Sequence, residues 1–280
     1  MKKFFQYLGI LCLVSFSFFY TEKTVSVVKE LDNIMIQIKE EQNSYKVEAI
    51  NAYINGNTII PGISGKEINI DKSYQRMRRL GKYNANLLEY QKVKPSISLK
   101  DNKDKYIISG NKTKKMVSLV FLVDGTDNIN TILQILNSNG IKGNFFVNSD
   151  WFSSNNNMVI KLIEKKHNIG NLSDNLNYQN STFIWMDTII KKIGKQKNSF
   201  CYKTGDTKDL DICASNKNYT ISPNIIVNNY PFIEIKDKLD SGSIIALNVN
   251  NAVERELELI IKYIKSKDLK IVNLLELIEE

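Results

Sequence analysis

The chain has 280 residues, of which 42% are hydrophobic and 24% are charged, and its formal net charge is +8. These fractions are ordinary for a globular protein and exclude a chain too polar to bury a core. No nucleic-acid-binding motif accompanies the positive charge, so we expect no nucleic-acid partner. The basic excess favours contact with anionic polymers or a membrane surface, although a solvated basic surface without a dedicated partner is the simpler interpretation.

The N-terminus combines positive charge with a long apolar run. Lys2 and Lys3 precede seventeen uncharged residues, Phe4 to Tyr20, a length at the short end of a membrane-spanning helix. Lysines before such a run place the N-terminus in the cytoplasm. Because Ser15-Phe16-Ser17 is a poor cleavage site for signal peptidase, we predict an uncleaved, single-pass signal anchor over residues 1–20. It would contact the membrane through residues 4–20 and leave the rest of the chain outside the cytoplasm; a cleaved signal peptide is the alternative.

Three further segments precede the largest part of the chain. Residues 21–42 carry apolar side chains at three- and four-residue steps, which predicts a stalk or packing helix. Residues 43–110 predict a small α+β domain, in which a helix starts at Asp71 as its N-cap. The polar run from Gly110 to Lys115 is typical of a linker. We therefore expect the largest domain to occupy residues 115–280.

The largest part of the chain alternates between expected strands and helices. Val117 to Val123 is an apolar strand that ends at Asp124, and Gly143 to Val147 is a second strand. A helix is expected over 129–139 after the first strand and another around 158–163 after the second, and a loop is expected over 167–176. A short strand is expected to end at Phe200, and further strands are expected over 224–227, 243–247 and 269–272. Further helices are expected over 183–193, 206–217, 252–265 and 274–278. This alternation is typical of an α/β domain.

Three motifs in this region carry a resemblance to a known family. Lys142 to Val147 is similar to a strand reading A-T-F-F-V, Lys166 to Asn171 to G-H-E-I-G-N, and Gly242 to Leu247 to G-S-I-I-L-L. In order and spacing these motifs resemble the polysaccharide deacetylase family (carbohydrate esterase family 4, the NodB homology domain) over about residues 115–280. The resemblance implies an irregular (β/α)7-type barrel whose functional loops leave the C-terminal ends of the strands.

The resemblance also implies an activity and a metal. The family removes N-acetyl groups from peptidoglycan or a related glycan. The first Asp of its D-D-G motif is a general base, the second Asp and two His bind a divalent metal such as zinc, and a late His is the general acid. Such a metal activates water and polarises the amide that is cleaved. In this sequence the two metal-binding His positions fall on Leu172 and Leu176, and the late His falls on Asn248.

These substitutions remove the family's chemistry. Leucine cannot ligate a metal, and asparagine cannot deliver a proton as imidazolium does. Asp124 is the one catalytic candidate. If the first strand has one extra residue, Asp124 aligns with the second Asp of the D-D-G motif; without it, the two Asp positions of that motif fall on Leu122 and Val123. We therefore expect no metal, no other cofactor, and an inactive protein that binds cell-wall glycan or another envelope protein. An active hydrolase with an unfamiliar set of residues is the alternative.

Three residues are candidates for glycan binding. Cys201-Tyr202-Lys203-Thr204-Gly205 stands where the family has R-P-P-Y-G, and Tyr230 falls on a later loop. Tyr202, Lys203 and Tyr230 therefore occupy positions where the family has cleft residues. Aromatic faces suit sugar rings, although a tyrosine at a strand end usually serves in packing.

Acidic residues offer a second kind of site. Asp124, Asp174 and Asp206 follow elements of the expected barrel and could gather at one end of it. Three carboxylates can bind a hard cation such as Ca²⁺ or Mg²⁺. Separate, solvated loop residues are the simpler interpretation.

His167, Cys201 and Cys213 are expected to be structural. His167 is the single histidine and matches the family's His before I-G-N, so we expect it to be buried or to brace a loop. The two cysteines lie twelve residues apart in a part of the chain expected outside the cytoplasm, where disulfides persist. A bridge between them and two free thiols are both compatible with the sequence.

Overall fold

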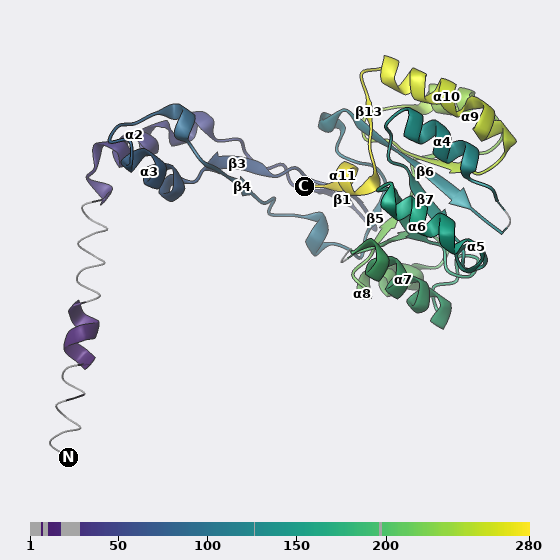
Figure 1. The fold of residues 1–280 in the computed structure, drawn as a ribbon, viewed down its shortest axis with the longest axis horizontal. Coiled ribbons are helices and arrows are strands. Elements are labelled where there is room, and N and C mark those ends of the chain that lie inside the picture. Colours follow the sequence, from purple (N-terminus) through teal and green to yellow (C-terminus); the bar gives the residue numbers. More distant parts are fainter. Residues whose placement is uncertain (1–6, 8–10, 18–28, 126, 196–197) are drawn as a thin grey trace. The chain divides into compact units, whose positions relative to one another are not determined.

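The structure, a computed structural model, describes residues 7, 11–17, 29–125, 127–195 and 198–280. The chain forms two compact units: an N-terminal unit of residues 1–49 and 64–93, and a sheet unit of residues 50–63 and 94–280 (Figure 1). This division differs from the domain expected over residues 43–110. Residues 50–63 and 94–110 belong to the sheet unit because they contribute strands to its large sheet.

The N-terminal unit combines two helices with a two-stranded sheet. Helix α2 (Asn33–Glu41) and helix α3 (Ile70–Arg78) pack together, and strand β3 (Gly65–Ile68) pairs antiparallel with β4 (Tyr90–Val93). The 3-10 helices η1 (Gln42–Tyr45) and η2 (Ala85–Leu87) complete the unit. Its buried core consists of Ile34, Met35, Ile38, Ile68, Tyr74, Met77 and Leu88.

Neither helix of this unit has the bounds that the sequence predicts. Of the helix expected over 21–42, residues 21–28 lie outside the described residues. Residues 29–30 are helical, but the helix is interrupted at Leu31 and Asp32. Helix α2 starts after Asp32, whose backbone is extended and whose carboxylate accepts the Ile34 N–H at 2.8 Å. Helix α3 is capped by Asn69 rather than by Asp71, because the Asn69 side chain accepts the Lys72 N–H at 3.0 Å.

The predicted signal anchor over residues 1–20 is described only at residue 7 and over residues 11–17, which are helical. No helix in the described part of the chain is long and apolar enough to cross a membrane. The anchor therefore stays a prediction from the sequence.

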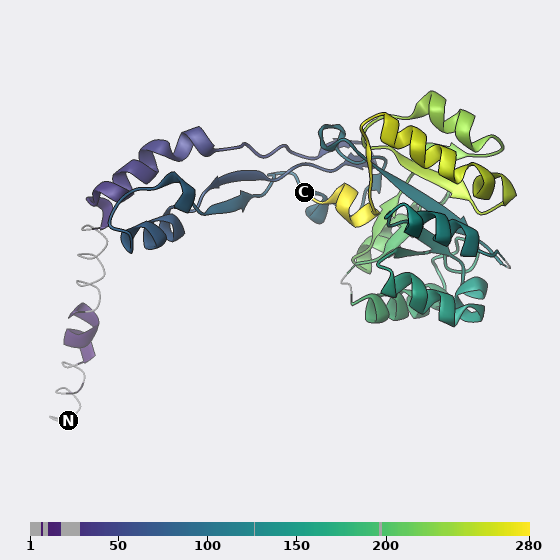
Figure 2. The same ribbon diagram turned by 45° about the horizontal axis from the view of Figure 1, so that its top comes forward.

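The sheet unit is built on one curled, open sheet (Figures 1 and 2). Over the described residues its strand order is β1-β2-β5-β10-β9-β8-β7-β6-β12-β11, with β13 also paired to β6. All these pairs are parallel except β1–β2. The strands are β1 (Tyr53–Asn55), β2 (Thr58–Ile60), β5 (Tyr106–Ile107), β6 (Met116–Val123), β7 (Asn144–Val147), β8 (Asn168–Asn171), β9 (Phe200–Tyr202), β10 (Tyr219–Ile221), β11 (Ile225–Val227), β12 (Ile244–Asn248) and β13 (Lys270–Ile271). The expected α/β class is confirmed, in the form of a half-barrel.

Helices follow most of these strands. They are α4 (Asn130–Ser138), α5 (Ser149–Ser154), α6 (Asn156–Glu164), α7 (Ser181–Gly194), α8 (Thr207–Ser215), α9 (Pro231–Lys238), α10 (Asn251–Ser266) and α11 (Leu274–Ile278), with the 3-10 helices η3 (Leu99–Asp101) and η4 (Lys112–Lys114). The helices expected over 129–139, 183–193, 206–217, 252–265 and 274–278 are present as α4, α7, α8, α10 and α11. The sequence did not predict α5, α9 or β10.

The pleat of β6 separates two buried cores. Leu119, Phe121 and Val123 belong to a core that also contains residues of α4 and α10. Val120 belongs to a second core on the other face of the sheet, and Leu122 packs against it. Successive side chains of a strand point to opposite faces. The residue after the strand, Asp124, therefore continues the face of Leu122.

Part of the expected loop over 167–176 is a strand. Among its residues, Asn168 to Asn171, Ile169 is the one large apolar side chain. A hydrophobicity pattern therefore does not reveal the strand. Pairing with β7 on one side and β9 on the other fixes it. Gly170 is required there, because a Cβ at that position would lie 2.4 Å from the ring of Phe146.

The expected linker from Gly110 to Lys115 is instead packed within the sheet unit. The Gly110 N–H donates to the Gly242 carbonyl at 2.8 Å. A Cβ on Gly110 would lie 2.6 Å from the side chain of Leu277 in α11. The segment is therefore fixed to the turn before β12 and to the C-terminal helix.

The structural role expected of His167 is confirmed, and of the two alternatives that the sequence left open for the cysteines the structure has the bridge. His167 is 3% exposed, and its Nδ1 accepts the Gly143 N–H at 3.0 Å. Burial, with a smaller contribution from the charge of Lys142, lowers the pKa of His167 to about 4, so the ring is neutral at pH 7. Cys201 and Cys213 form a disulfide that joins β9 to α8, with their Cα atoms 6.5 Å apart.

Candidate functional site

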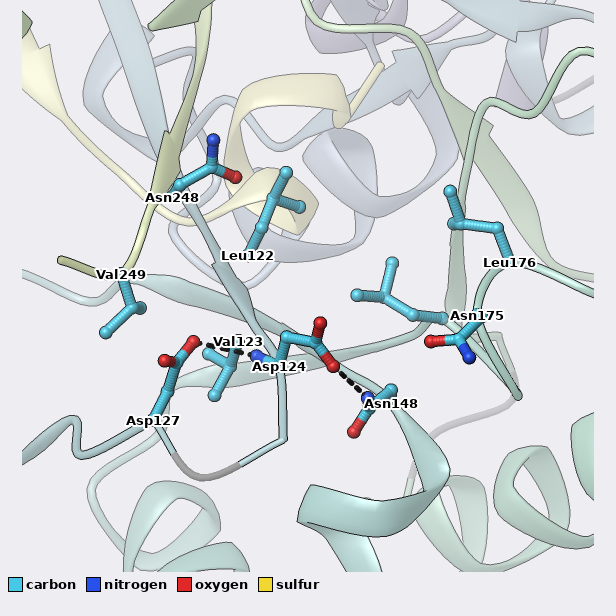
Figure 3. A pocket seen from close by; sticks show the side chains of 10 residues that line it. Leu122, Val123, Asp124, Asp127, Asn148, Asn175, Leu176, Asn248 and Val249 are labelled. Carbon is cyan, nitrogen blue, oxygen red and sulfur yellow. Dashed lines mark hydrogen bonds between the residues drawn. The ribbon is translucent and has the colours of Figure 1, made fainter. Parts of the chain in front are cut away.

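A pocket of about 430 Å³ opens where β6, β8 and β12 end at their carboxyl ends (Figure 3). We call it the strand-end pocket. It is lined by Leu122, Val123, Asp124, Asp127, Asn148, Leu172, Asn175, Leu176, Asn248 and Val249. The carboxyl edge of a parallel sheet is the usual place for a ligand site in α/β folds, because the loops that leave it converge there.

The two carboxylates of the pocket come from the turn after β6. The Asp124 N–H donates to Oδ2 of Asp127 at 2.9 Å, and the Asn148 side-chain amide donates to Oδ1 of Asp124 (Figure 3). Both carboxylates are thereby held on the same side of the pocket.

Asn148 ties this turn to the next element of the chain. It is the N-cap of α5, and its side-chain oxygen accepts the Trp151 N–H at 2.9 Å. The Trp151 indole N–H in turn donates to the main-chain carbonyl of Asp127 at 2.9 Å, and the ring is fully buried. A closed set of hydrogen bonds therefore fixes the acidic side of the pocket.

The loop after β8 supplies the apolar side of the pocket. Leu172 is buried in the second core, and Leu176 packs against that core while still lining the pocket. Asn175 and Leu176 have positive φ angles of 48° and 65°. A branched residue such as leucine rarely adopts this conformation, so the loop carries backbone strain. A hydrogen bond from the Leu176 N–H to the Leu172 carbonyl, 2.8 Å long, holds the turn.

Asn248 completes the lining from β12. It is exposed at the end of that strand, and its Cα lies in register with Leu122 of β6. The position expected for the general acid is thus at the pocket, and an amide occupies it.

Comparison with known proteins identifies the domain. Residues 109–219 match the polysaccharide deacetylase family. They form a polysaccharide deacetylase domain. The chain is also similar to the uncharacterized protein YlxY of Bacillus subtilis (strain 168), with 26% identity over 283 residues that cover 92% of this chain and 87% of that protein.

Solved structures share the fold of this deacetylase domain. BA3943, a CE4 family pseudoenzyme from Bacillus anthracis, is similar with a TM-score of 0.67 and 23% identity, over 89% of this chain and 96% of that one. A BA3943 mutant with restored enzymatic activity gives the same TM-score and identity, over 89% and 99% of the two chains. The Bc1960 peptidoglycan N-acetylglucosamine deacetylase is similar with a TM-score of 0.55 and 19% identity, over 61% and 92%.

The donor set of this deacetylase domain does not fit a catalytic divalent metal. Such a site needs about three nitrogen or oxygen ligands around one open position. Over the described residues no group of three His, Cys, Asp or Glu side chains is placed to hold a metal ion. At the strand-end pocket, Asp124 and Asp127 lie together, and the lining also contains Leu172 and Leu176, the residues that the sequence resemblance aligns with the family's histidines.

The other acidic candidates do not join Asp124 in the deacetylase domain. Asp206 is the N-cap of α8 and accepts the Lys208 N–H at 2.9 Å and the Gln179 side-chain amide at 3.1 Å. Asp174 is exposed on the loop after β8 and does not line the strand-end pocket. The carboxylate that accompanies Asp124 is Asp127. Its place three residues after Asp124, in a turn that follows a buried strand, was the signal available in the sequence.

Tyr202, Lys203 and Tyr230 lie outside the lining of the strand-end pocket. The Tyr202 ring packs edge-on against Phe146, with centroids 6.0 Å apart, and burial raises its pKa to about 12. Lys203 places its Nζ 5.2 Å from the centre of the Tyr106 ring. Tyr230 is 66% exposed at the start of α9. The lining residues that the sequence did not single out include Asp127, Asn148 and Asn175.

Proposed function

We propose that this chain is a catalytically inactive, polysaccharide-deacetylase-like protein of a bacterial envelope, and that its deacetylase domain binds cell-wall glycan without cleaving it. The observation that carries the proposal is the lining of the strand-end pocket. That lining includes Leu172, Leu176 and Asn248, which the sequence resemblance aligns with the two metal-binding histidines and the general acid. None of the three can ligate a catalytic metal through nitrogen or transfer a proton.

Two kinds of observation support the envelope location. Lys2 and Lys3 precede an apolar run at the N-terminus, and Cys201 and Cys213 form a disulfide in the sheet unit. Structural disulfides persist outside the cytoplasm and are rare within it. The names of similar proteins agree with this setting, since Bc1960 is a peptidoglycan N-acetylglucosamine deacetylase.

The state of the pocket favours a glycan over a protein chain as the ligand. The space has not collapsed around the two leucines, and it keeps five polar side chains among its ten lining residues. A concave site with a few fixed polar groups in an apolar lining suits a small, hydroxylated ligand. A surface for another envelope protein would instead be broad and flat, with an apolar centre.

The proposal is tested by measuring binding and cleavage on the same protein. The purified chain should be retained by peptidoglycan in a pulldown and should release no acetate from an N-acetylated glycan, while an active deacetylase serves as the positive control. Asn248→Trp fills the pocket from an exposed position, so it should abolish retention without unfolding the domain. Tyr230→Ala, outside the pocket, is the matched control and should bind normally.

Acetate release that a pocket substitution abolishes would refute the inactive assignment and establish a hydrolase with an unfamiliar set of residues. Retention that is unaffected by Asn248→Trp would refute the pocket as the glycan site.

A further inference from the structure

The strand-end pocket is negatively charged as well as partly apolar. Its lining contains two carboxylates, Asp124 and Asp127, and among the described residues no lysine, arginine or histidine contributes to it. The other polar groups are the neutral amides of Asn148, Asn175 and Asn248. A cationic group is therefore attracted to this space and an anionic group is repelled. Asp124 is exposed and Asp127 is half-buried, so salt screens this attraction and the preference is strongest at low ionic strength.

Each carboxylate is held through one oxygen and keeps the other available. Asp127 Oδ2 accepts the Asp124 N–H, and Asp124 Oδ1 accepts the Asn148 amide. Within the described part of the chain, the second oxygen of each carboxylate accepts no hydrogen bond. In Figure 3 the second oxygen of Asp124 points away from Asn148, toward the space between Leu122 and Leu176. The pocket therefore offers fixed, charged acceptors to a molecule that enters it.

An ammonium group fits these acceptors better than a metal ion does. Ca²⁺ takes roughly six to eight oxygen ligands, yet the side-chain oxygen of Asn148 is already occupied by the Trp151 N–H. The loop after β8 adds the side chains of Leu172 and Leu176, which have no oxygen to offer. An ammonium group needs one acceptor for each N–H, and the carbon that carries it packs favourably against aliphatic groups.

We propose that the strand-end pocket binds the free amino group of an N-deacetylated amino sugar in the glycan. The inference rests on the proposed glycan-binding function and names the sugar that the site selects. The ammonium group is placed against Asp124 and Asp127, the sugar hydroxyls against Asn175 and Asn248, and the ring carbons against Leu172 and Leu176. The domain then recognises the product of an N-deacetylation rather than its substrate.

The carboxylates also explain why an N-acetylated sugar is disfavoured. An acetamido group carries no charge and has one N–H donor, so it offers the carboxylates no counter-charge and fewer donors than an ammonium group does. Hydrogen bonds between two charged groups are roughly twice as strong as those between neutral groups. The site therefore favours a sugar that carries a charged amine over its neutral, acetylated analogue.

Calorimetry with the purified full chain tests this inference. The probes are a glucosamine tetramer and an N-acetylglucosamine tetramer, with a lysine-containing tripeptide and Ca²⁺ as further ligands. The dissociation constant of the glucosamine tetramer should be lower than that of its acetylated counterpart by about tenfold or more, as expected when charge-assisted hydrogen bonds replace neutral ones. Asp124→Asn and Asp127→Asn should remove that preference. Asp237→Asn, which neutralises an exposed carboxylate on α9, should leave it unchanged.

The outcomes separate this inference from the function on which it rests. Equal binding of both tetramers would overturn the ammonium preference and leave glycan binding intact. Binding of neither tetramer would overturn both. If the tripeptide binds as tightly as the glucosamine tetramer, the pocket is an amine site without sugar selectivity. If Ca²⁺ binds and Asp124→Asn abolishes that binding, the pocket is a metal site. Either result overturns the inference.

Discussion

The side chain of Asn148 donates a hydrogen bond to Asp124 while its oxygen caps helix α5 through the Trp151 N–H. One asparagine therefore sets both the start of a helix and the position of the pocket's first carboxylate. The consequence is that the acidic side of the strand-end pocket is coupled to the folding of the chain around Trp151.

We predict that Asn148→Ala destabilises the protein by about 1 kcal/mol, the usual cost of losing an N-cap. Urea unfolding measures this as a lower midpoint with an unchanged slope. Asn229→Ala, at an exposed asparagine before α9, should change stability by less than about 0.5 kcal/mol. Equal effects of the two substitutions would contradict the capping role.

Restoring one metal ligand should restore no chemistry. Leu172→His adds one imidazole beside Asp124, whereas activity requires the ligands, the base and the acid together. Elemental analysis should find no stoichiometric Zn²⁺, and acetate release should stay at background. The double variant Leu172→His/Leu176→His completes a three-ligand set with Asp124, so it should gain about one metal per chain and still release no acetate. Turnover by the single variant would contradict this prediction.

The buried His167 should make stability depend on pH. Its pKa is about 4 in the fold and about 6.5 when unfolded, so the unfolded state binds the proton first as the pH falls. The stability is fully present above about pH 6.5 and is lost progressively toward pH 4, by about 2 kcal/mol at pH 5. Urea midpoints at pH 7.5 and pH 5 measure this loss. His167→Gln can still accept the Gly143 N–H but cannot titrate, and it should lose about 2 kcal/mol less; an identical loss in both proteins would assign the effect to other groups.

Breaking the disulfide between Cys201 and Cys213 should lower stability by about 3 kcal/mol, because the bridge closes a short loop in the unfolded chain. Thermal unfolding with and without a reductant measures this. The double variant Cys201→Ala/Cys213→Ala should show the lowered stability under both conditions. A wild-type protein that unfolds identically with and without reductant would contradict the bridge.

The N-terminal residues should keep the protein in the membrane. Protease added to spheroplasts should digest residues 21–280, and membranes should retain the intact chain. The signal-anchor prediction would be wrong if a soluble secreted form starting near Phe18 were recovered.

The elements with the clearest hydrophobic patterns were predicted well. Strand β6 and helices α7 and α10 carry apolar side chains at the spacing of their own secondary structure, and each lies where the sequence placed it. Strand β8 was not predicted, because Asn168, Gly170 and Asn171 lack an apolar signal and depend on pairing with β7 and β9.

Local sequence determined the family resemblance of the domain and the expectation that its chemistry is lost. Leucine at positions 172 and 176 and asparagine at 248 cannot ligate a metal or transfer a proton in any fold, so these conclusions need only residue type and motif order. The tertiary structure decided which side chains meet. It paired Asp124 with Asp127 and Asn148 instead of Asp174 and Asp206, and it placed Tyr202 and Tyr230 away from the pocket. The contact of Asp124 with Asp127 lies within one turn, whereas that with Asn148 joins two successive strand ends; both depend on turn geometry, strand register and the direction of each side chain, which a hydrophobicity pattern does not contain.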